Sequence, residues 1–71
     1  MKLSEFINHL AHKSLKLKII AFDYDMNYMI KIFEGTIGEL LHWVKYPMVM
    51  DFVVENVCPE DNNFFEVRIY G

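Results

Sequence analysis

Residues 33–44 read Phe-Glu-Gly-Thr-Ile-Gly-Glu-Leu-Leu-His-Trp-Val, and the hydrophobic period changes within this stretch. Upstream, residues 17–33 read as two strands around a polar turn. Downstream, apolar residues recur at helical spacing: Ile37, Leu40, Leu41 and Val44. Thr36 and Glu39 have the spacing of a capping box, in which the hydroxyl and the carboxylate each accept a hydrogen bond from the other residue's amide. We therefore predict that a strand ends and a helix begins at Thr36.

The residues before this junction predict a helix followed by a β-hairpin. Ser4 is the expected N-cap of the helix, which should end near Lys13–Ser14. Its apolar face repeats every three or four residues: Leu3, Phe6, Ile7, Leu10 and Ala11. Residues 15–22 begin with strict alternation and predict a strand, residues 23–27 predict a turn, and residues 28–34 predict the returning strand.

The residues after the junction predict a second helix and a second pair of strands. The helix should run from residue 37 to about 46, where Pro47 stops it. Residues 49–57 and 65–70 alternate as strands around a polar turn at 59–63. Trp43 lies between the core positions of the helix, so we expect it to be half exposed.

This order, α-β-β-α-β-β, predicts one α+β domain over residues 1–71. Its natural form is a two-layer fold with an antiparallel four-stranded sheet and both helices on one face. The other face of the sheet would meet water, as antiparallel sheets tolerate. It would carry six charged residues: Lys16, Lys18, Asp51, Glu55, Glu66 and Arg68.

Composition narrows the class of protein. The 71 residues are 54% apolar and 15% aromatic, which excludes a disordered chain. Cys58 is the single cysteine, so no intrachain disulfide forms, and this favours a reducing compartment. Neither a signal-peptide pattern nor an apolar run of about 20 residues is present. We expect a soluble cytoplasmic protein with no membrane association.

Charge is divided unevenly along the chain. The formal net charge is −3, yet residues 1–22 hold four lysines against Glu5 alone. The acidic remainder cannot neutralise phosphates, which supply most nucleic-acid affinity, so nucleic acid is not the expected partner. The acids are either ordinary solvated faces or a surface for a protein with a basic face.

Two groups of residues have side chains that could bind a metal ion, but the surrounding sequence argues against both sites. Asp23, Asp25, Asn27 and Glu34 match the ligand spacing of a calcium loop, but Tyr28 stands where the loop requires glycine, and the flanking residues alternate as strands. His9 and His12 would be neighbours on the first helix. A zinc site needs four ligands, and His42 and Cys58 could complete one only if the fold happened to bring them close to this pair. We expect no metal, no cofactor and no catalytic residues, and hence no enzyme.

Aromatic residues outside the clearest core positions suggest a protein interface. Tyr and Trp are favoured at such interfaces because they bring large contact areas at small entropic cost. The alternative is that these aromatics cover the margins of a small core. Together with nearby acids, the predicted partner-binding residues are Trp43, Tyr46, Tyr24, Asp25, Glu60, Asp61, Phe64 and Tyr70.

Three segments resemble small phage and prophage proteins of Gram-positive bacteria: Asp23-Tyr24-Asp25-Met26-Asn27, the junction from Glu34 to Leu40, and Pro59-Glu60-Asp61-Asn62. The resemblance covers most of the chain after Leu17. It implies an accessory protein in the host cytosol that binds and inhibits a host protein, as anti-CRISPR inhibitors of CRISPR-Cas or another defence nuclease do. The alternatives are a structural or homo-oligomeric module, for which a homodimer is one form, and an OB-like or sheet-based nucleic-acid binder.

Overall fold

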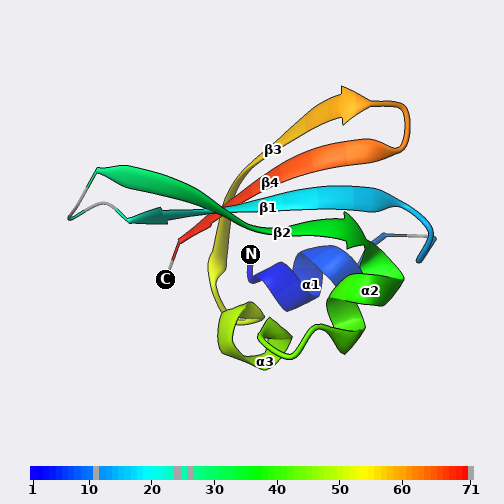
Figure 1. Ribbon diagram of the computed structural model, residues 1–71, viewed down its shortest axis with the longest axis horizontal. Coiled ribbons are helices and arrows are strands. Elements are labelled where there is room, and N and C mark those ends of the chain that lie inside the picture. Colours follow the sequence, from blue (N-terminus) through cyan, green and yellow to red (C-terminus); the bar gives the residue numbers. More distant parts are fainter. Residues whose placement is uncertain (11, 24, 26, 71) are drawn as a thin grey trace.

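Strand β1 (Lys16–Asp23) lies in the middle of a four-stranded sheet in the computed structural model, which describes residues 1–10, 12–23, 25 and 27–70. The other strands are β2 (Tyr28–Thr36), β3 (Val53–Asp61) and β4 (Phe64–Tyr70), in the spatial order β2-β1-β4-β3. The described helices are α1 (Leu3–Asn8), α2 (Ile37–His42) and α3 (Tyr46–Val49). All three lie on one face of the sheet (Figure 1), which confirms the predicted α+β domain with two layers.

The prediction of a wholly antiparallel sheet is wrong. β1 pairs antiparallel with β2, and β3 with β4, but the two hairpins are joined through a parallel pairing of β1 with β4. β2 and β3 consequently run in the same direction at opposite edges. Residues 37–52 carry the chain back along the helix layer between them, and parallel strands need a crossover of about this length.

The predicted second helix is divided in two. α2 ends at His42, Trp43 has an extended ψ of 130°, and α3 begins at Tyr46. Pro47 therefore lies in the first turn of α3, where its missing N–H costs no hydrogen bond, and does not terminate α2. β3 accordingly starts at Val53 instead of Val49, and it runs through Pro59 to Asp61, so the predicted turn at 59–63 shortens to Asn62 and Asn63.

The first helix is shorter than its pattern predicts. It begins at Leu3 with Lys2, not Ser4, as its N-cap, and the Lys2 amide donates to Glu5 Oε1 at 2.9 Å. It ends at Asn8, so His9 and His12 are not neighbours on a helix. Leu3 and Ile7 nevertheless form its buried face as predicted, whereas Ala11 lies outside the described residues.

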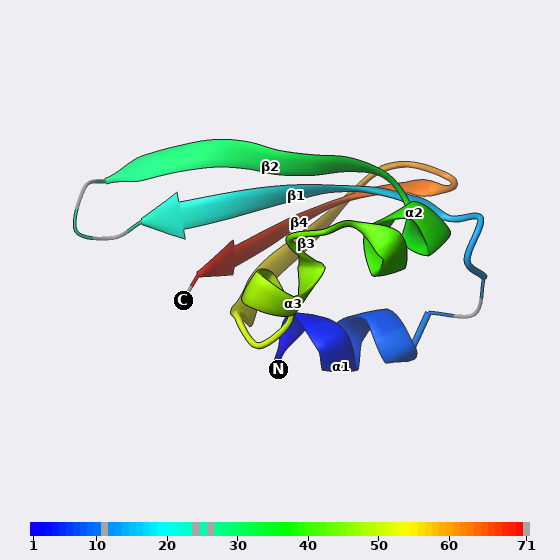
Figure 2. The same ribbon diagram turned by 60° about the horizontal axis from the view of Figure 1, so that its bottom comes forward.

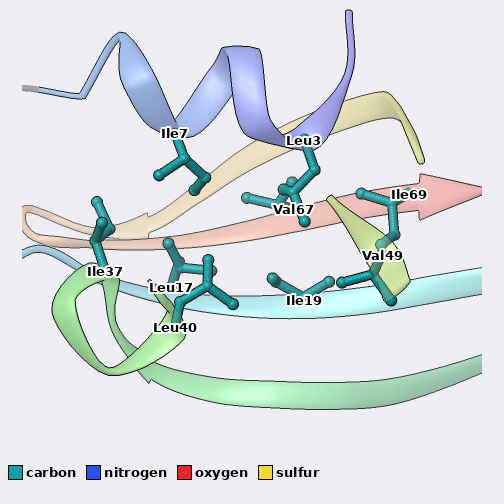
Figure 3. Close-up of a cluster of buried hydrophobic side chains, with 9 residues drawn as sticks. All are labelled: Leu3, Ile7, Leu17, Ile19, Ile37, Leu40, Val49, Val67 and Ile69. Atoms are coloured by element: carbon teal, nitrogen blue, oxygen red, sulfur yellow. The ribbon is translucent and has the colours of Figure 1, made fainter. Parts of the chain in front are cut away.

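The core lies between the helix layer and the two central strands. Leu17 and Ile19 of β1 and Val67 and Ile69 of β4 are completely buried, as their alternation predicts. Figure 3 shows side chains from all three helices pointing onto these strands. The helix contribution consists of Leu3, Ile7, Ile37, Leu40 and Val49.

The capping box at Thr36 is confirmed. The Glu39 amide donates to Thr36 Oγ1 at 3.1 Å, and the Thr36 amide donates to Glu39 Oε1 at 3.0 Å. These two bonds satisfy amides that the start of α2 would otherwise leave unpaired. The junction therefore ends β2 and turns the chain into the helix layer.

Candidate protein-docking surface

The predicted partner-binding residues do not form one surface. Trp43 and Tyr46 belong to the α2–α3 segment, which comprises residues 37–49. Asp25 lies in the β1–β2 turn. Glu60, Asp61 and Phe64 lie at the β3–β4 turn, which Figure 1 places at the opposite end of the sheet from the β1–β2 turn. Tyr70 ends β4, and Tyr24 lies outside the described residues.

The acids at the β3–β4 end are partly engaged by basic residues of the sheet. Lys18 Nζ lies 2.9 Å from Glu60 Oε1 and 3.5 Å from Glu66 Oε1, and Arg68 Nε lies 2.9 Å from Glu66 Oε2. The hydrogen bond from Arg68 lowers the pKa of Glu66, and the hydrogen bond to Glu60 raises the pKa of Lys18. Glu60 is therefore not an unpaired acid, although Asp61 beside it is exposed.

The face of the sheet opposite the helices, called the open face, carries only some of the charged residues that were predicted there. Lys18, Glu66 and Arg68 lie on it and form one network of ion pairs. Asp51 does not lie on the sheet, because it precedes β3, where Lys2 Nζ is 3.7 Å from its Oδ1. Lys18 and Arg68 thus meet carboxylates of the same chain.

Trp43 and Tyr46 close the margin of the core. The Trp43 ring lies 5.2 Å from that of Phe33, tilted by 45°, and Trp43 is half-buried as predicted. Tyr46 is also half-buried, and its burial raises the pKa of its hydroxyl. Both aromatics therefore stabilise the fold as well as contributing surface.

Exposed apolar side chains gather instead on β2 and on the α2–α3 segment. Tyr28 and Ile30 of β2 lie on the helix side of the sheet and are 55% and 47% exposed, whereas Met29 lies on the opposite face and is 52% exposed. Val44 and Met48 are 85% and 73% exposed. Single exposed apolar residues are ordinary on a protein surface, but a cluster of them marks an interaction site.

The reason for this exposure is that the β1–β2 hairpin extends past the helices (Figure 2). β2 has nine residues and spans about 30 Å, whereas α2 and α3, with six and four residues, span about 9 and 6 Å. The helix layer cannot cover the whole strand. Alternation along β2 does not show which of its residues the helices cover, whereas a comparison of element lengths shows that this end is uncovered.

A groove runs between β2 and the α2–α3 segment, and we call it the hairpin groove. It has a volume of about 340 Å³ and is lined by Ile30, Lys31, Ile32, Trp43, Lys45, Met48 and Val49. Its walls are apolar, and its charged lining residues are Lys31 and Lys45. Ile30 also lines a hollow on its other side that reaches Phe52 and the β1–β2 turn. Exposed apolar surface therefore continues on both sides of Ile30.

The former calcium candidate is a hairpin, as predicted from its alternation. β1 ends at Asp23 and β2 starts at Tyr28, so Glu34 lies six residues along β2, opposite Lys18 and paired with Lys31 at 3.0 Å. That ion pair lowers the pKa of Glu34. Within the described ranges, His, Cys, Asp and Glu do not gather in any group of three or more that could hold a metal ion.

Comparison with protein-family models, curated proteins and solved structures finds no match for this chain. Within the part of the chain that the structure describes, no helix has the length and apolarity needed to cross a membrane. The function must therefore be inferred from the surfaces of this chain.

Proposed function

We propose that this protein is a non-catalytic docking domain that binds another protein through the hairpin groove. The observation that supports the proposal is the group of exposed apolar residues around that groove, above all Met48 and Ile30, which are 73% and 47% exposed. A groove with apolar walls beside a sheet suits an extended segment or a short helix of a partner. In its most specific form, the partner is a host protein that the docking inhibits, as the resemblance to phage proteins implies.

The charges of the groove set the chemistry of the partner. Lys31 and Lys45 line it, and Lys45 is exposed. An apolar segment with an adjacent carboxylate would complement Lys45, whereas Lys31 is already paired with Glu34. This differs from the expected partner with a basic surface, because Glu60 is already paired with Lys18, and the exposed acids Asp25 and Asp61 lie at different turns.

The experiment is capture of a partner from a Gram-positive bacterial lysate on the immobilised protein, compared with two single variants. M48D places a charge in the hairpin groove and should abolish capture of the wild-type partner. M29D is the matched control, because Met29 is similarly exposed but pairs with Phe22 on the open face of the sheet. Circular dichroism should show that both variants are folded.

Equal capture by wild type and M48D would contradict the proposal, because it would mean that the hairpin groove does not bind the partner. The inhibitory form requires in addition that the captured partner, once purified, loses activity when this protein is added.

A further inference from the structure

The two edges of the sheet differ in their readiness to accept another strand. β3 is obstructed, because Pro59 lacks an N–H, two register shifts interrupt its ladder, and Lys2 pairs with Val53 on its outer side. β2 pairs with β1 on one side, and across the described residues no strand lies on its other side. An edge of this kind presents unpaired backbone N–H and C=O groups to any approaching strand.

A bulge in β2 brings two opposite charges onto the same face. The register shifts at Ile32, since Ile19 pairs with Phe33 whereas Ile20 pairs with Lys31. Without the bulge, Lys31 and Glu34 would point to opposite faces of the sheet. With it, both lie on the open face, 3.0 Å apart from Lys31 Nζ to Glu34 Oε1.

We propose that a second copy of this chain pairs antiparallel with β2, so that Lys31 of each copy lies opposite Glu34 of the other. If Ile32 is bulged in both copies, the two-fold axis passes by Phe33. The pairing then puts Ile30 opposite Gly35, whose lack of a side chain leaves room for the isoleucine. The result is one continuous sheet made from two copies.

Charge selects this register over its neighbours. The smallest slip that keeps every side chain on its own face is two residues. In one direction such a slip sets Lys31 opposite Lys31, and in the other it sets Glu34 opposite Glu34. Like charges directly opposite each other destabilise a strand pair, whereas opposite charges stabilise it. In the proposed register, four charges alternate in sign around the axis.

The proposal goes beyond partner docking and does not depend on it. It uses the outer backbone edge of β2, whereas the docking proposal uses side chains of β2 and of the α2–α3 segment that line the hairpin groove. A single strand pair buries less than a standard interface, so the dimer should be weak and reversible. Met48 lies outside the paired strands, so M48D should still dimerise, which separates the two proposals experimentally.

Sedimentation over a concentration series tests the dimer. The wild type should shift reversibly from monomer to dimer as its concentration rises. K31E and E34K should each weaken self-association by about tenfold or more, because each makes both cross pairs like-charged. An equimolar mixture of K31E and E34K should associate again, because in the mixed dimer both cross pairs join a Glu to a Lys.

K45E is the matched control. It changes the net charge as K31E does, but Lys45 lies outside β2. K45E alone should dimerise like the wild type, and a mixture of K45E with E34K should not show the restored association. A wild type that stays monomeric throughout would overturn the proposal. So would folded K31E that dimerises normally, or K31E and E34K that fail to associate when mixed.

Discussion

β2 and β3 lie at opposite edges of one sheet, yet among the residues that the structure describes, the chain closes only the edge of β3. The Val54 amide donates to the Met1 carbonyl at 2.7 Å, the Leu3 amide donates to the Phe52 carbonyl at 2.8 Å, and Pro59 interrupts what remains. β2 has a single bulge and a pair of charges. Natural proteins usually obstruct their exposed edges, and β2 carries the weaker obstruction of the two.

The helices also cover the β3 edge of the sheet more completely than the β2 edge. α1 packs beside β3, and α2 contacts β2 near the capping box, but the far half of β2 projects beyond α3 (Figure 2). The side chains there are consequently exposed on both faces of the hairpin. The molecule therefore combines a firm central pair of strands with a hairpin whose outer half is stabilised mainly by its own pairing.

The largest effect should come from a pair of identical substitutions, one at the centre and one at the open edge. Ile19 is completely buried in β1, whereas Ile30 is 47% exposed in β2. I19A should destabilise the domain by about 2–5 kcal/mol through lost burial and a cavity. I30A should cost less than about 1 kcal/mol, because little buried volume is lost. Urea denaturation of both variants measures the difference, and equal costs would mean that the projecting hairpin is packed after all.

Amide hydrogen exchange sharpens the comparison of the two edges directly. The Val54 amide is hydrogen-bonded to the Met1 carbonyl, whereas the amides of residues 28–31 that point away from β1 face solvent. At low protein concentration, the Val54 amide should therefore exchange at least about tenfold more slowly than those β2 amides. Raising the concentration should slow those β2 amides if copies pair there. Exchange of both edges at one rate would show that residues 1–3 do not protect β3.

The next largest effect concerns the capping box, which fixes where β2 ends. T36A should destabilise the domain by about 1 kcal/mol, since the Glu39 amide loses its acceptor. S4A is the matched control, because Ser4 lies inside α1 and Lys2 holds the N-cap position. Its unfolding midpoint should stay near that of the wild type. A larger loss of stability for S4A than for T36A would mean that the Ser4 side chain contributes more to capping than that of Thr36.

Local patterns predicted those parts of the fold that depend on near neighbours in sequence. The Thr36–Glu39 spacing is complete within four residues, so it identifies the start of α2 without any tertiary information. Alternation identifies Leu17 and Ile19 as core for the same reason, because a central strand is covered along most of its length. The half exposure of Trp43 was also predicted, but Trp43 lies beyond the end of α2, and its burial follows from packing against Phe33.

Features that depend on distant segments could not be predicted in this way. The parallel pairing of β1 with β4 arises from the route that residues 37–52 take, and strand patterns carry no information on that route. Pro47 reads equally as the end of one helix and the start of another, and the extended backbone at Trp43 decides between them. The exposure of Ile30 and Met48 depends on which residues the short helices fail to cover.

The smallest effect should be the pH dependence of the capping box, at the end of the open edge. The bond from the Thr36 amide lowers the pKa of Glu39. A carboxyl whose pKa is lower in the folded state stabilises the fold above its unfolded pKa of about 4.3, and this contribution is lost as the pH falls through the folded pKa.

E39Q keeps the acceptor oxygen but cannot ionise. Its midpoint in urea should lie slightly below that of the wild type near neutral pH, and the two should converge as the pH falls below the folded-state pKa of Glu39. The pKa values of Glu34 and Glu66 are lowered too, so E39Q should itself remain acid-sensitive. A gap between E39Q and wild type that stays constant with pH would mean that the charge of Glu39 contributes nothing, and that the cap acts through hydrogen bonding alone.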